Sequence, residues 1–519
     1  MRHTGTTKTR VRGPFARNRR GIAAVLGATS VVVGVACGGS DAPSDGAKDA
    51  GASDTGVALP DGSFPDVSAD AADARVAMDG DVPDVADAAA YGYVRRLPFL
   101  RGRGTARGAV LLEEGTRQTA VVAGFSGDGW LGEYPVDAPD SFTWRTLEQS
   151  RFKSILRTKA GGLALSGATR EGDAGTEPSF PFAMLMDDKR NVLWKKHLGR
   201  GLGTGSAYGM AEASNGDFLV VGSASVGSPN GFDVRVTRLK PDGTAIWEQT
   251  YGGSAAGDAG KGLTPGTEKP VSILALADGG AVVVGSTNAT FGSGNEDVWA
   301  FRISESGSIA WQVAYGGPKA DVAFGASLAP DGKKVWITGS TTSFGKGSGD
   351  AWLLAVDTTT GFISSQTTFG SADRAEHARS VAFPADGGML VVGTDPEGML
   401  VLRLDADRTV VWQRKYRNAA ALDGWAYGVQ ALETADHGFA YLAGGFERAW
   451  LVKSAADGTL GGCKLGGFGT ELVSTTFVTA TSNAIAVPTS VAPVPRTPIV
   501  SDLRVELRDA TSTVSDACR

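Results

Sequence analysis

Short apolar runs alternate with turns rich in Gly, Asn and Asp along most of the chain between residues 94 and 464. Residues 205–253 hold four such runs, and residues 268–317 repeat the arrangement. The turn sequences SNGD, SPNG and PDG between the runs are typical of β-hairpins. We find no long segment with apolar residues at helical spacing. The pattern therefore predicts an all-β protein built from four-stranded units.

Three marks recur among the units, although Ser365 and Gly462 stand where two units would have the late tryptophan. The clearest mark is an apolar run that ends in glycine. The second is a tryptophan late in the unit. The third is a residue pair that opens the expected third strand and directly precedes another tryptophan. The glycines are Gly124, Gly167, Gly222, Gly285, Gly339, Gly393 and Gly444. The late tryptophans are Trp144, Trp194, Trp247, Trp311 and Trp412, and the earlier ones are Trp299, Trp352 and Trp450.

The spacing of these units is typical of a β-propeller. A period of about 50 residues with four strands matches one propeller blade. A lone four-stranded sheet cannot bury both of its faces, whereas blades arranged radially bury both. We therefore expect a propeller over residues 91–464, with seven blades and with six or eight as alternatives.

The two ends of this region complement each other. VRRLPFLRGRGT at 94–105 is similar to the end of the second repeat at 194–204, so it is a fourth strand without its first three. The last repeat, about 425–464, has three good strands and then GTLGGCK. We expect residues 94–100 to complete the last blade and close the ring.

The N-terminus is typical of an export signal. Residues 1–20 are basic, residues 21–36 are apolar or small, and about 16 residues is short for a membrane span. GVAC at 34–37 resembles the lipobox of bacterial lipoproteins, although Gly34 stands where Leu is usual. The resemblance implies a signal peptide at 1–36, lipidation (palmitate) of Cys37 and, because Gly38 follows, placement in the outer membrane on either face. The alternative is an ordinary secretory signal.

Two further segments flank the expected propeller. Residues 37–90 are rich in Asp, Ala, Gly and Ser and predict a disordered tether. Residues 465–519 predict a β-rich tail packed on the propeller. If Cys37 is lipidated, Cys463 and Cys518 are the remaining thiols of an exported protein, so we expect a disulfide between them, with two separate thiols as the alternative.

Charge narrows the range of partners. The formal net charge is −6, and removal of the leader with its seven Lys and Arg residues leaves about −13. An acidic exported protein is a poor candidate for nucleic-acid binding, which needs a basic face. We expect a monomer that contacts the membrane through its lipid anchor.

The repeat also resembles a known group. The pattern W-x-x-x-[YF]-G-G followed by V-V-x-G-[ST] resembles the β-propeller repeats of exported bacterial proteins and lipoproteins; Trp247, Tyr251, Trp311 and Tyr315 carry it. LKPDGTAIWE is similar to the tryptophan-docking motif of quinoprotein-type propellers, one of which belongs to the outer-membrane β-barrel assembly machine. The chain lacks the adjacent cysteine pair often found in the quinone enzymes of that group.

Candidate chemistry is sparse. His197, His377 and His437 have no second metal ligand at useful spacing, and no G-x-S-x-G motif is present. Asp233, Asp297 and Asp350 recur before third strands. They are candidate loop contacts to a ligand or calcium, although the simpler interpretation is that each caps its own turn. We assign no catalytic residue and no cofactor, with calcium as the alternative.

These observations favour a binding or scaffold protein with a protein or glycan partner and no catalytic activity. The alternatives are a polysaccharide lyase or hydrolase that uses the acidic loop residues as acid and base, and a lipoprotein of outer-membrane protein assembly. A propeller hosts many functions, so the fold does not choose among them.

Overall fold

The computed structural model describes residues 93–97, most of residues 105–460, and six short strands between residues 478 and 516. Gaps within 105–460 are 116, 137–141, 171–178, 200–203, 226–230, 253–266, 289–295, 346, 372–373, 397, 417–426 and 445–448. The expected signal peptide and tether lie outside the described residues, as do Cys37, Cys463 and Cys518. Among the described residues no helix is long and apolar enough to cross a membrane.

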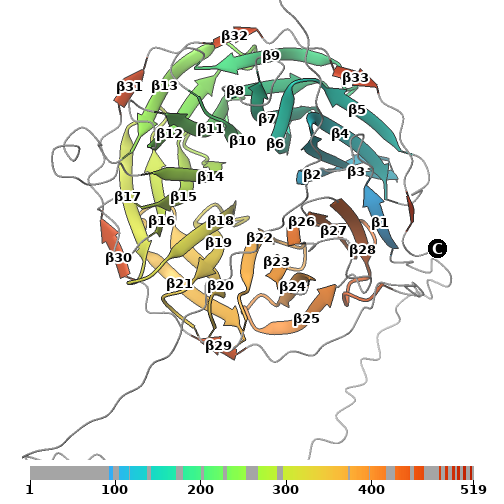
Figure 1. Ribbon diagram of the computed structural model, residues 1–519, viewed down its shortest axis with the longest axis vertical. Helices are drawn as coiled ribbons and strands as arrows, with labels where there is room; N and C mark the ends of the chain where they lie inside the picture. Colours follow the sequence, from blue (N-terminus) through green and yellow to red (C-terminus); the bar gives the residue numbers. More distant parts are fainter. Residues whose placement is uncertain are drawn as a thin grey trace, which may run out of the picture. The chain divides into compact units, whose positions relative to one another are not determined.

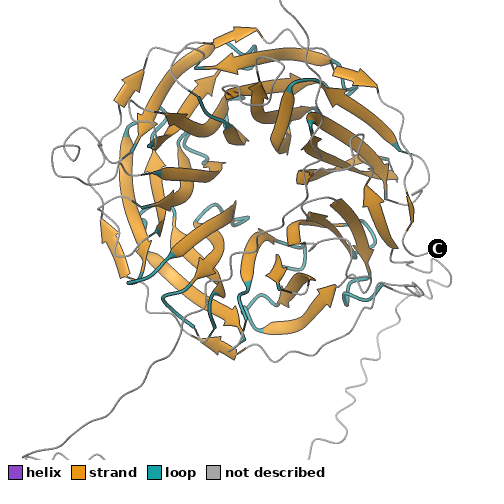
Figure 2. Cartoon of the chain, in the orientation of Figure 1, coloured by secondary structure: helices purple, strands orange, loops and turns teal. Residues whose placement is uncertain are grey.

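Seven antiparallel blades of four strands form a ring around a central channel (Figures 1 and 2). The first strand of each blade faces the channel. These strands are β2 (Thr105–Glu114), β6 (Ser150–Arg157), β10 (Ala207–Glu212), β14 (Glu268–Ala275), β18 (Asp321–Leu328), β22 (His377–Ala382) and β26 (Tyr427–Glu433). The second strands are β3 (Arg117–Ser126), β7 (Leu163–Arg170), β11 (Phe218–Ser225), β15 (Ala281–Thr287), β19 (Lys334–Thr341), β23 (Met389–Asp395) and β27 (Phe439–Gly444).

The outer half of each blade follows the same order. The third strands are β4 (Asp128–Pro135), β8 (Ser179–Met186), β12 (Phe232–Leu239), β16 (Asp297–Ile303), β20 (Asp350–Asp357), β24 (Gly398–Leu404) and β28 (Ala449–Ser454). The fourth strands are β5 (Thr143–Leu147), β9 (Val192–Leu198), β13 (Ala245–Tyr251), β17 (Ile309–Gly316), β21 (Ile363–Gly370), β25 (Val410–Tyr416) and β1 (Tyr93–Leu97). The predicted fold class and blade number are therefore confirmed, and the seven marker glycines all lie in second strands.

The core lies between neighbouring blades. All seven residues of β15 are buried, and so are all seven of β24, because each of these strands is covered on both faces. Val221 and Val236 of the third blade pack in one cluster with Val283 of the fourth. This arrangement explains why the second strands read as continuous apolar runs rather than as alternating ones.

In the third, fourth and sixth blades, the late tryptophan and the tyrosine four positions after it join the blade to the next one. Trp247 donates its Nε1 hydrogen to the carbonyl of Glu305 at 3.0 Å, and the Tyr251 hydroxyl donates to the carbonyl of Gly307 at 2.7 Å. Burial raises the pKa of the Tyr251 hydroxyl, so it stays a donor. Gly307 has a φ of 84°, a left-handed conformation that suits glycine.

The same joint recurs in two further blades. Trp311 and Tyr315 donate in the same way to the carbonyls of Thr358 and Gly361, at 3.0 and 2.7 Å. Trp412 and Tyr416 of blade six repeat the pair toward blade seven, where the carbonyls of Ala456 and Gly458 accept at 3.2 and 2.7 Å. The segments WEQTYG at 247–252 and WQVAYGG at 311–317 therefore join neighbouring blades.

The N-terminal strand closes the ring, as the sequence predicts. β1 pairs antiparallel with β28, in a register that runs from Tyr93 opposite Lys453 to Leu97 opposite Ala449. Blade seven thus takes three strands from the end of the repeat region and one from its beginning (Figure 1). Residues 98–100, which the prediction also included, lie outside the described residues.

The C-terminal strands follow the outer edge of the ring in the opposite direction to the blades. Each pairs antiparallel with the outermost strand of one blade, in the order five, four, three, two, one and seven. These strands are β29 (Val478–Ala480), β30 (Ile485–Pro488), β31 (Val494–Arg496), β32 (Val500–Asp502), β33 (Leu507–Asp509) and β34 (Ser515–Asp516). The last of them, β34, pairs with the ring-closing strand β1.

We predict that deletion of residues 91–104 lowers the melting temperature by on the order of 10 °C or more, because blade seven loses its fourth strand. Differential scanning calorimetry of the otherwise full chain checks this. Deletion of residues 60–73, an equal length of the predicted tether, is the control and is expected to leave the melting temperature unchanged. A ring that melts normally without β1 would contradict the role of this strand.

Candidate functional site

Every first strand carries a β-bulge, and all seven bulges occur near the start of the strand. In β2 the register slips between Ala106 and Gly108, which leaves Arg107 as the extra residue. The other extra residues are Lys153, Tyr208, Val271, Phe324, Arg379 and Val429. Each extra residue is exposed or half-buried, while the residue before it is buried. Bulges re-aim side chains in this way, and here each blade contributes one side chain to the channel.

The marker glycines explain why the bulges form where they do. A Cβ atom on Gly285 would lie 2.4 Å from the carbonyl oxygen of Lys269, two residues before the bulge. Gly124, Gly167, Gly222, Gly339 and Gly393 have the same relation to a first-strand carbonyl, at 1.9 to 2.5 Å. The carbonyl that the bulge turns toward the second strand therefore requires a residue without a side chain.

Blade seven is the exception. Its register places Ala443, rather than the marker Gly444, at the equivalent position. The facing first-strand residue is Gly428, where the other blades have a larger residue. The glycine has thus moved to the opposite strand of the pair, and the bulge at Val429 is kept.

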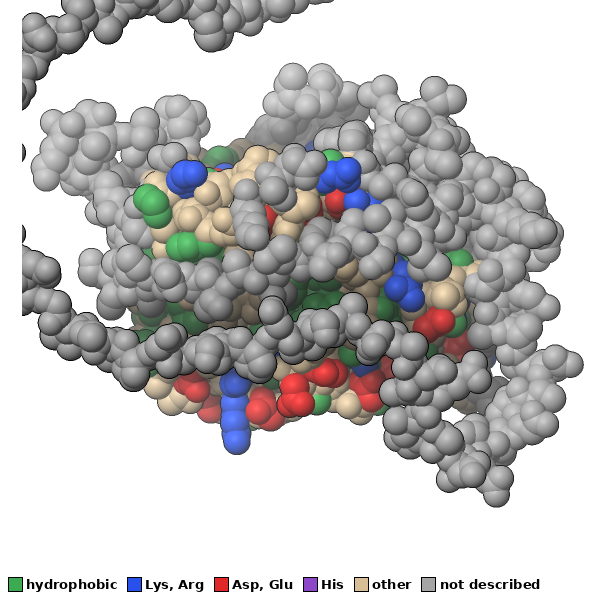
Figure 3. Space-filling model, turned by 90° about the horizontal axis from the view of Figure 1, so that it is seen from below, with side chains coloured by type: hydrophobic (Ala, Val, Ile, Leu, Met, Phe, Trp, Pro, Cys, Tyr) green, Lys and Arg blue, Asp and Glu red, His purple; other side chains and the backbone are tan. Residues whose placement is uncertain are grey.

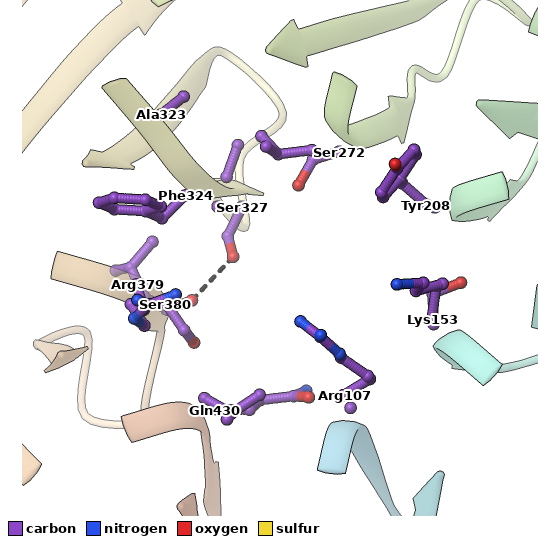
Figure 4. A pocket seen from close by; sticks show the side chains of 18 of the residues that line it. Arg107, Lys153, Tyr208, Ser272, Ala323, Phe324, Ser327, Arg379, Ser380 and Gln430 are labelled. Atoms are coloured by element: carbon purple, nitrogen blue, oxygen red, sulfur yellow. Dashed lines mark hydrogen bonds between the residues drawn. The ribbon is translucent and has the colours of Figure 1, made fainter. Parts of the chain in front are cut away.

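These seven residues line a pocket of about 1060 Å³ in the central channel. Figure 4 shows Arg107 and Lys153 directed into this space, with Tyr208 near Lys153 and with Arg379 beside the Phe324 ring at the wall. Lys269 and Glu296 also line it and form an ion pair at 3.0 Å. Glu296 is the one carboxylate among the lining residues that the structure describes, so the lining carries a net positive charge.

The cations of the channel lie against aromatic rings. The Arg379 guanidinium is 4.7 Å from the centroid of Phe324, and Lys153 is 5.8 Å from that of Tyr208. Both distances are within the range of cation–π attraction. Rings held in this way are themselves partly accessible; the exposed fraction of Tyr208 is 37%.

The opposite rim of the ring is acidic. Turns between first and second strands and between third and fourth strands share this rim because neighbouring strands run antiparallel. They carry Asp187, Asp188, Asp242, Asp278, Glu305, Asp331, Asp357, Asp386, Asp405, Asp407, Asp436 and Asp457. Figure 3, a view onto the edge of the ring, shows acidic side chains gathered along one rim. Hydrogen bonds from the backbone amides of Thr360 and Thr244 lower the pKa of Asp357 and Asp242, so both carboxyl groups stay ionised.

The predicted ligand carboxylates lie within blade joints. Asp297 and Asp350 open β16 and β20 and are 1% exposed, and Asp233 is the second residue of β12. A Cβ on Gly252, Gly316 or Gly370 would lie within 2.1 Å of the Oδ1 of Asp233, Asp297 or Asp350, respectively. Each carboxylate thus packs against a glycine at or just after the end of the fourth strand of its own blade, and the three are held apart in separate blades.

The start of the next blade brings a second buried acid to two of these carboxylates. Asp321 follows the joint of Asp297, and Glu376 follows that of Asp350. Burial raises the pKa of Glu376, and the carboxylates of Asp395 and Asp350 raise it further. No group of three or more His, Cys, Asp or Glu residues that could hold a metal ion occurs in the part of the chain that the structure describes.

The three histidines lie in separate blades. His197 is buried with Nδ1 3.3 Å from the Thr169 hydroxyl, and His437 is in an exposed turn, 3.5 Å from Glu433. His377 lies edge-on to Phe324 at 5.5 Å, and burial and the nearby Arg379 lower its pKa. His377 is therefore neutral at physiological pH and adds no charge to the channel.

Comparisons with known proteins give only distant likenesses. No protein-family model and no curated protein matches the chain. Among solved structures, the polysaccharide lyase Uly1 is 10% identical with a TM-score of 0.40, over 68% of this chain and 90% of that one. Drosophila Plexin A in complex with Semaphorin 1b is 7% identical with a TM-score of 0.39, over 70% and 87%. The chain is a seven-bladed β-propeller.

We predict that Gly285→Ala destabilises the protein by about 1–3 kcal/mol, because the new methyl group overpacks against the Lys269 carbonyl. Ala443→Gly, at the equivalent position of blade seven, is the matched control and is expected to cost less than about 1 kcal/mol. Urea unfolding followed by tryptophan fluorescence measures both. Equal stability of Gly285→Ala and the parent chain would show that the glycine does not set the bulge.

Proposed function

We propose that the protein is a lipid-anchored, non-catalytic binding propeller of the bacterial cell envelope that takes an acidic glycan at the mouth of its central channel. The seven extra residues of the first-strand bulges carry this proposal. Three of their side chains are basic and two are aromatic. Cations attract the negative groups of such a glycan, and the aromatic rings offer faces on which sugars stack.

The charge distribution supports the same ligand class. The formal net charge of the chain is −6, yet Arg107, Lys153 and Arg379 gather in the channel while the turns of one rim are acidic. A positively charged channel mouth in a protein of net negative charge concentrates the positive electrostatic potential at the mouth, where it attracts anions.

The lining favours binding over hydrolysis. Hydrolysis of a glycosidic bond by the usual route needs two carboxyl groups that flank the bond. Glu296 is the single carboxylate in the described lining, and it is held by Lys269. Asp233, Asp297 and Asp350, which the hydrolase alternative requires, lie in blade joints rather than together in the channel.

We predict that the triple variant Arg107→Ala, Lys153→Ala, Arg379→Ala binds polygalacturonate or heparin at least about tenfold more weakly than the parent protein, because each lost cation removes a charge-assisted contact. Fluorescence anisotropy with labelled glycans at fixed salt measures the affinities. The matched control replaces Lys189, Lys240 and Lys333, which are exposed on the acidic rim, with alanine.

Two results would contradict the proposal. One is equal loss of binding in the control variant, which would indicate a general charge effect. The other is turnover of the bound glycan, detected as new reducing ends or unsaturated sugars, which would establish the lyase or hydrolase alternative. Neutral dextran is expected not to bind to either variant.

We predict that Cys37→Ser moves the protein from the outer-membrane fraction to the soluble fraction, since the acyl chains on this residue anchor the mature chain. Immunoblotting of fractionated cells checks the location, and mass spectrometry of the mature N-terminus checks the acyl groups. Retention of the variant in the membrane fraction would contradict anchoring through Cys37.

A further inference from the structure

One aromatic ring next to two of the channel cations has three cations around it. Phe125 of β3 lies 5.4 Å from the Arg107 guanidinium, 5.1 Å from that of Arg151 and 5.1 Å from the Lys153 ammonium. Arg107 comes from blade one, and Arg151 and Lys153 from the first strand of blade two. We call Arg107, Phe125, Arg151 and Lys153 the Phe125 cluster.

The cluster holds like charges close together. Burial lowers the pKa of Lys153 to about 8, and repulsion from Arg107 adds to this effect. No carboxylate forms an ion pair with Arg107, Arg151 or Lys153 among the described residues. The Arg151 Nε atom is buried and has no hydrogen-bond partner there. The attraction of the Phe125 face is modest, so the positive charge is only partly compensated.

The surroundings are arranged for access from the channel. Arg107 and Lys153 line the pocket, and Figure 4 shows both side chains pointing into it. Arg151 precedes the bulge residue Lys153 by two positions on the same strand. A ligand that enters the channel thus meets Arg107 and Lys153 at the surface, and Arg151 lies behind them on the same Phe125 ring.

We propose that the Phe125 cluster is a subsite for a tetrahedral oxyanion, a phosphate or sulfate group on a glycan. This proposal rests on the proposed function and specifies the group that the channel mouth recognises. Guanidinium groups offer paired N–H donors that match phosphate and sulfate oxygens. A tetrahedral group presents at least three acceptor oxygens, enough for all three cations, whereas a planar carboxylate presents two.

Binding is expected to depend on the protonation of Lys153. Arg107 from β2, Arg151 from β6 itself and Tyr208 from β10 are the charged or titratable groups around it. A bound anion favours the ammonium form and therefore raises the pKa of Lys153 above its value of about 8 in the free protein. Affinity is thus full below pH 8 and falls as the pH rises past it.

The test uses the full-length mature protein and isothermal titration with inorganic sulfate, whose charge is constant over this pH range. Arg107→Ala is expected to weaken sulfate binding about tenfold or more. Lys153→Ala is expected to weaken it and to remove the pH dependence above pH 8. Lys153→Arg is expected to keep the affinity but flatten the pH profile, because arginine does not titrate there.

Arg379→Ala serves as the control, since Arg379 lines the mouth but lies against Phe324 instead of Phe125. It is expected to weaken glycan binding and to leave sulfate affinity unchanged, so that the subsite and the proposed function can fail separately. Sulfate affinity that is equal in the parent protein and in Arg107→Ala, or acetate affinity that equals sulfate affinity, would overturn the subsite.

Two further titrations identify the carrier of the anion. Glucose 6-phosphate is expected to bind at least as well as inorganic phosphate, because its sugar adds contacts in the channel. Vesicles of phosphatidylglycerol present phosphate on a lipid surface and are expected not to bind the soluble Cys37→Ser protein. Binding to the vesicles but not to the sugar phosphate would overturn the assignment to a glycan.

Discussion

A single close contact within each blade governs the rest of this structure. A first-strand carbonyl turns toward the second strand, and six of the seven blades meet it with a glycine. An alanine there would place its methyl group on the carbonyl oxygen, so the bulge and the glycine are kept together. The bulge in turn decides which residue of the inner strand faces the channel. The side chains at the channel mouth are therefore positioned by a buried contact between a carbonyl and a glycine, which itself takes no part in binding.

The blade-to-blade joints perform a different task. The tryptophan and tyrosine of one fourth strand hold the next blade by its outer turn, at an acceptor whose glycine has a positive φ. These joints lie near the periphery, whereas the bulges lie at the centre. Side chains at the mouth can thus differ from blade to blade while the frame that carries them stays constant. Arg107, Tyr208 and Val271 occupy equivalent positions and share no chemistry.

The repeat marks were sufficient to predict the fold. Glycine, tryptophan and turn spacing gave the blade number, and the complementary faults at the two ends gave the closing strand. The sequence did not reveal the channel residues, because the bulge residues differ in type from blade to blade. Arg107 or Lys153 therefore forms no repeated pattern. The marker glycines identify the bulge residues indirectly, because in six blades the glycine is paired with the residue just before the bulge. The pairing register of the first and second strands is needed to use this signal. Asp297 and Asp350 recurred for the opposite reason: they pack in the joint, which is the part that repeats.

The position of β1 also bears on how the chain folds during synthesis. β1 is among the first ordered strands to leave the ribosome, yet it pairs with β28 and β34, which are made last. Contacts so distant in sequence form slowly. Six blades can therefore assemble while both edges of β1 are still unpaired. An incomplete chain leaves the ring open at blade seven and exposes strand edges that invite wrong pairings. Closure of the ring therefore distinguishes a finished molecule from an unfinished one.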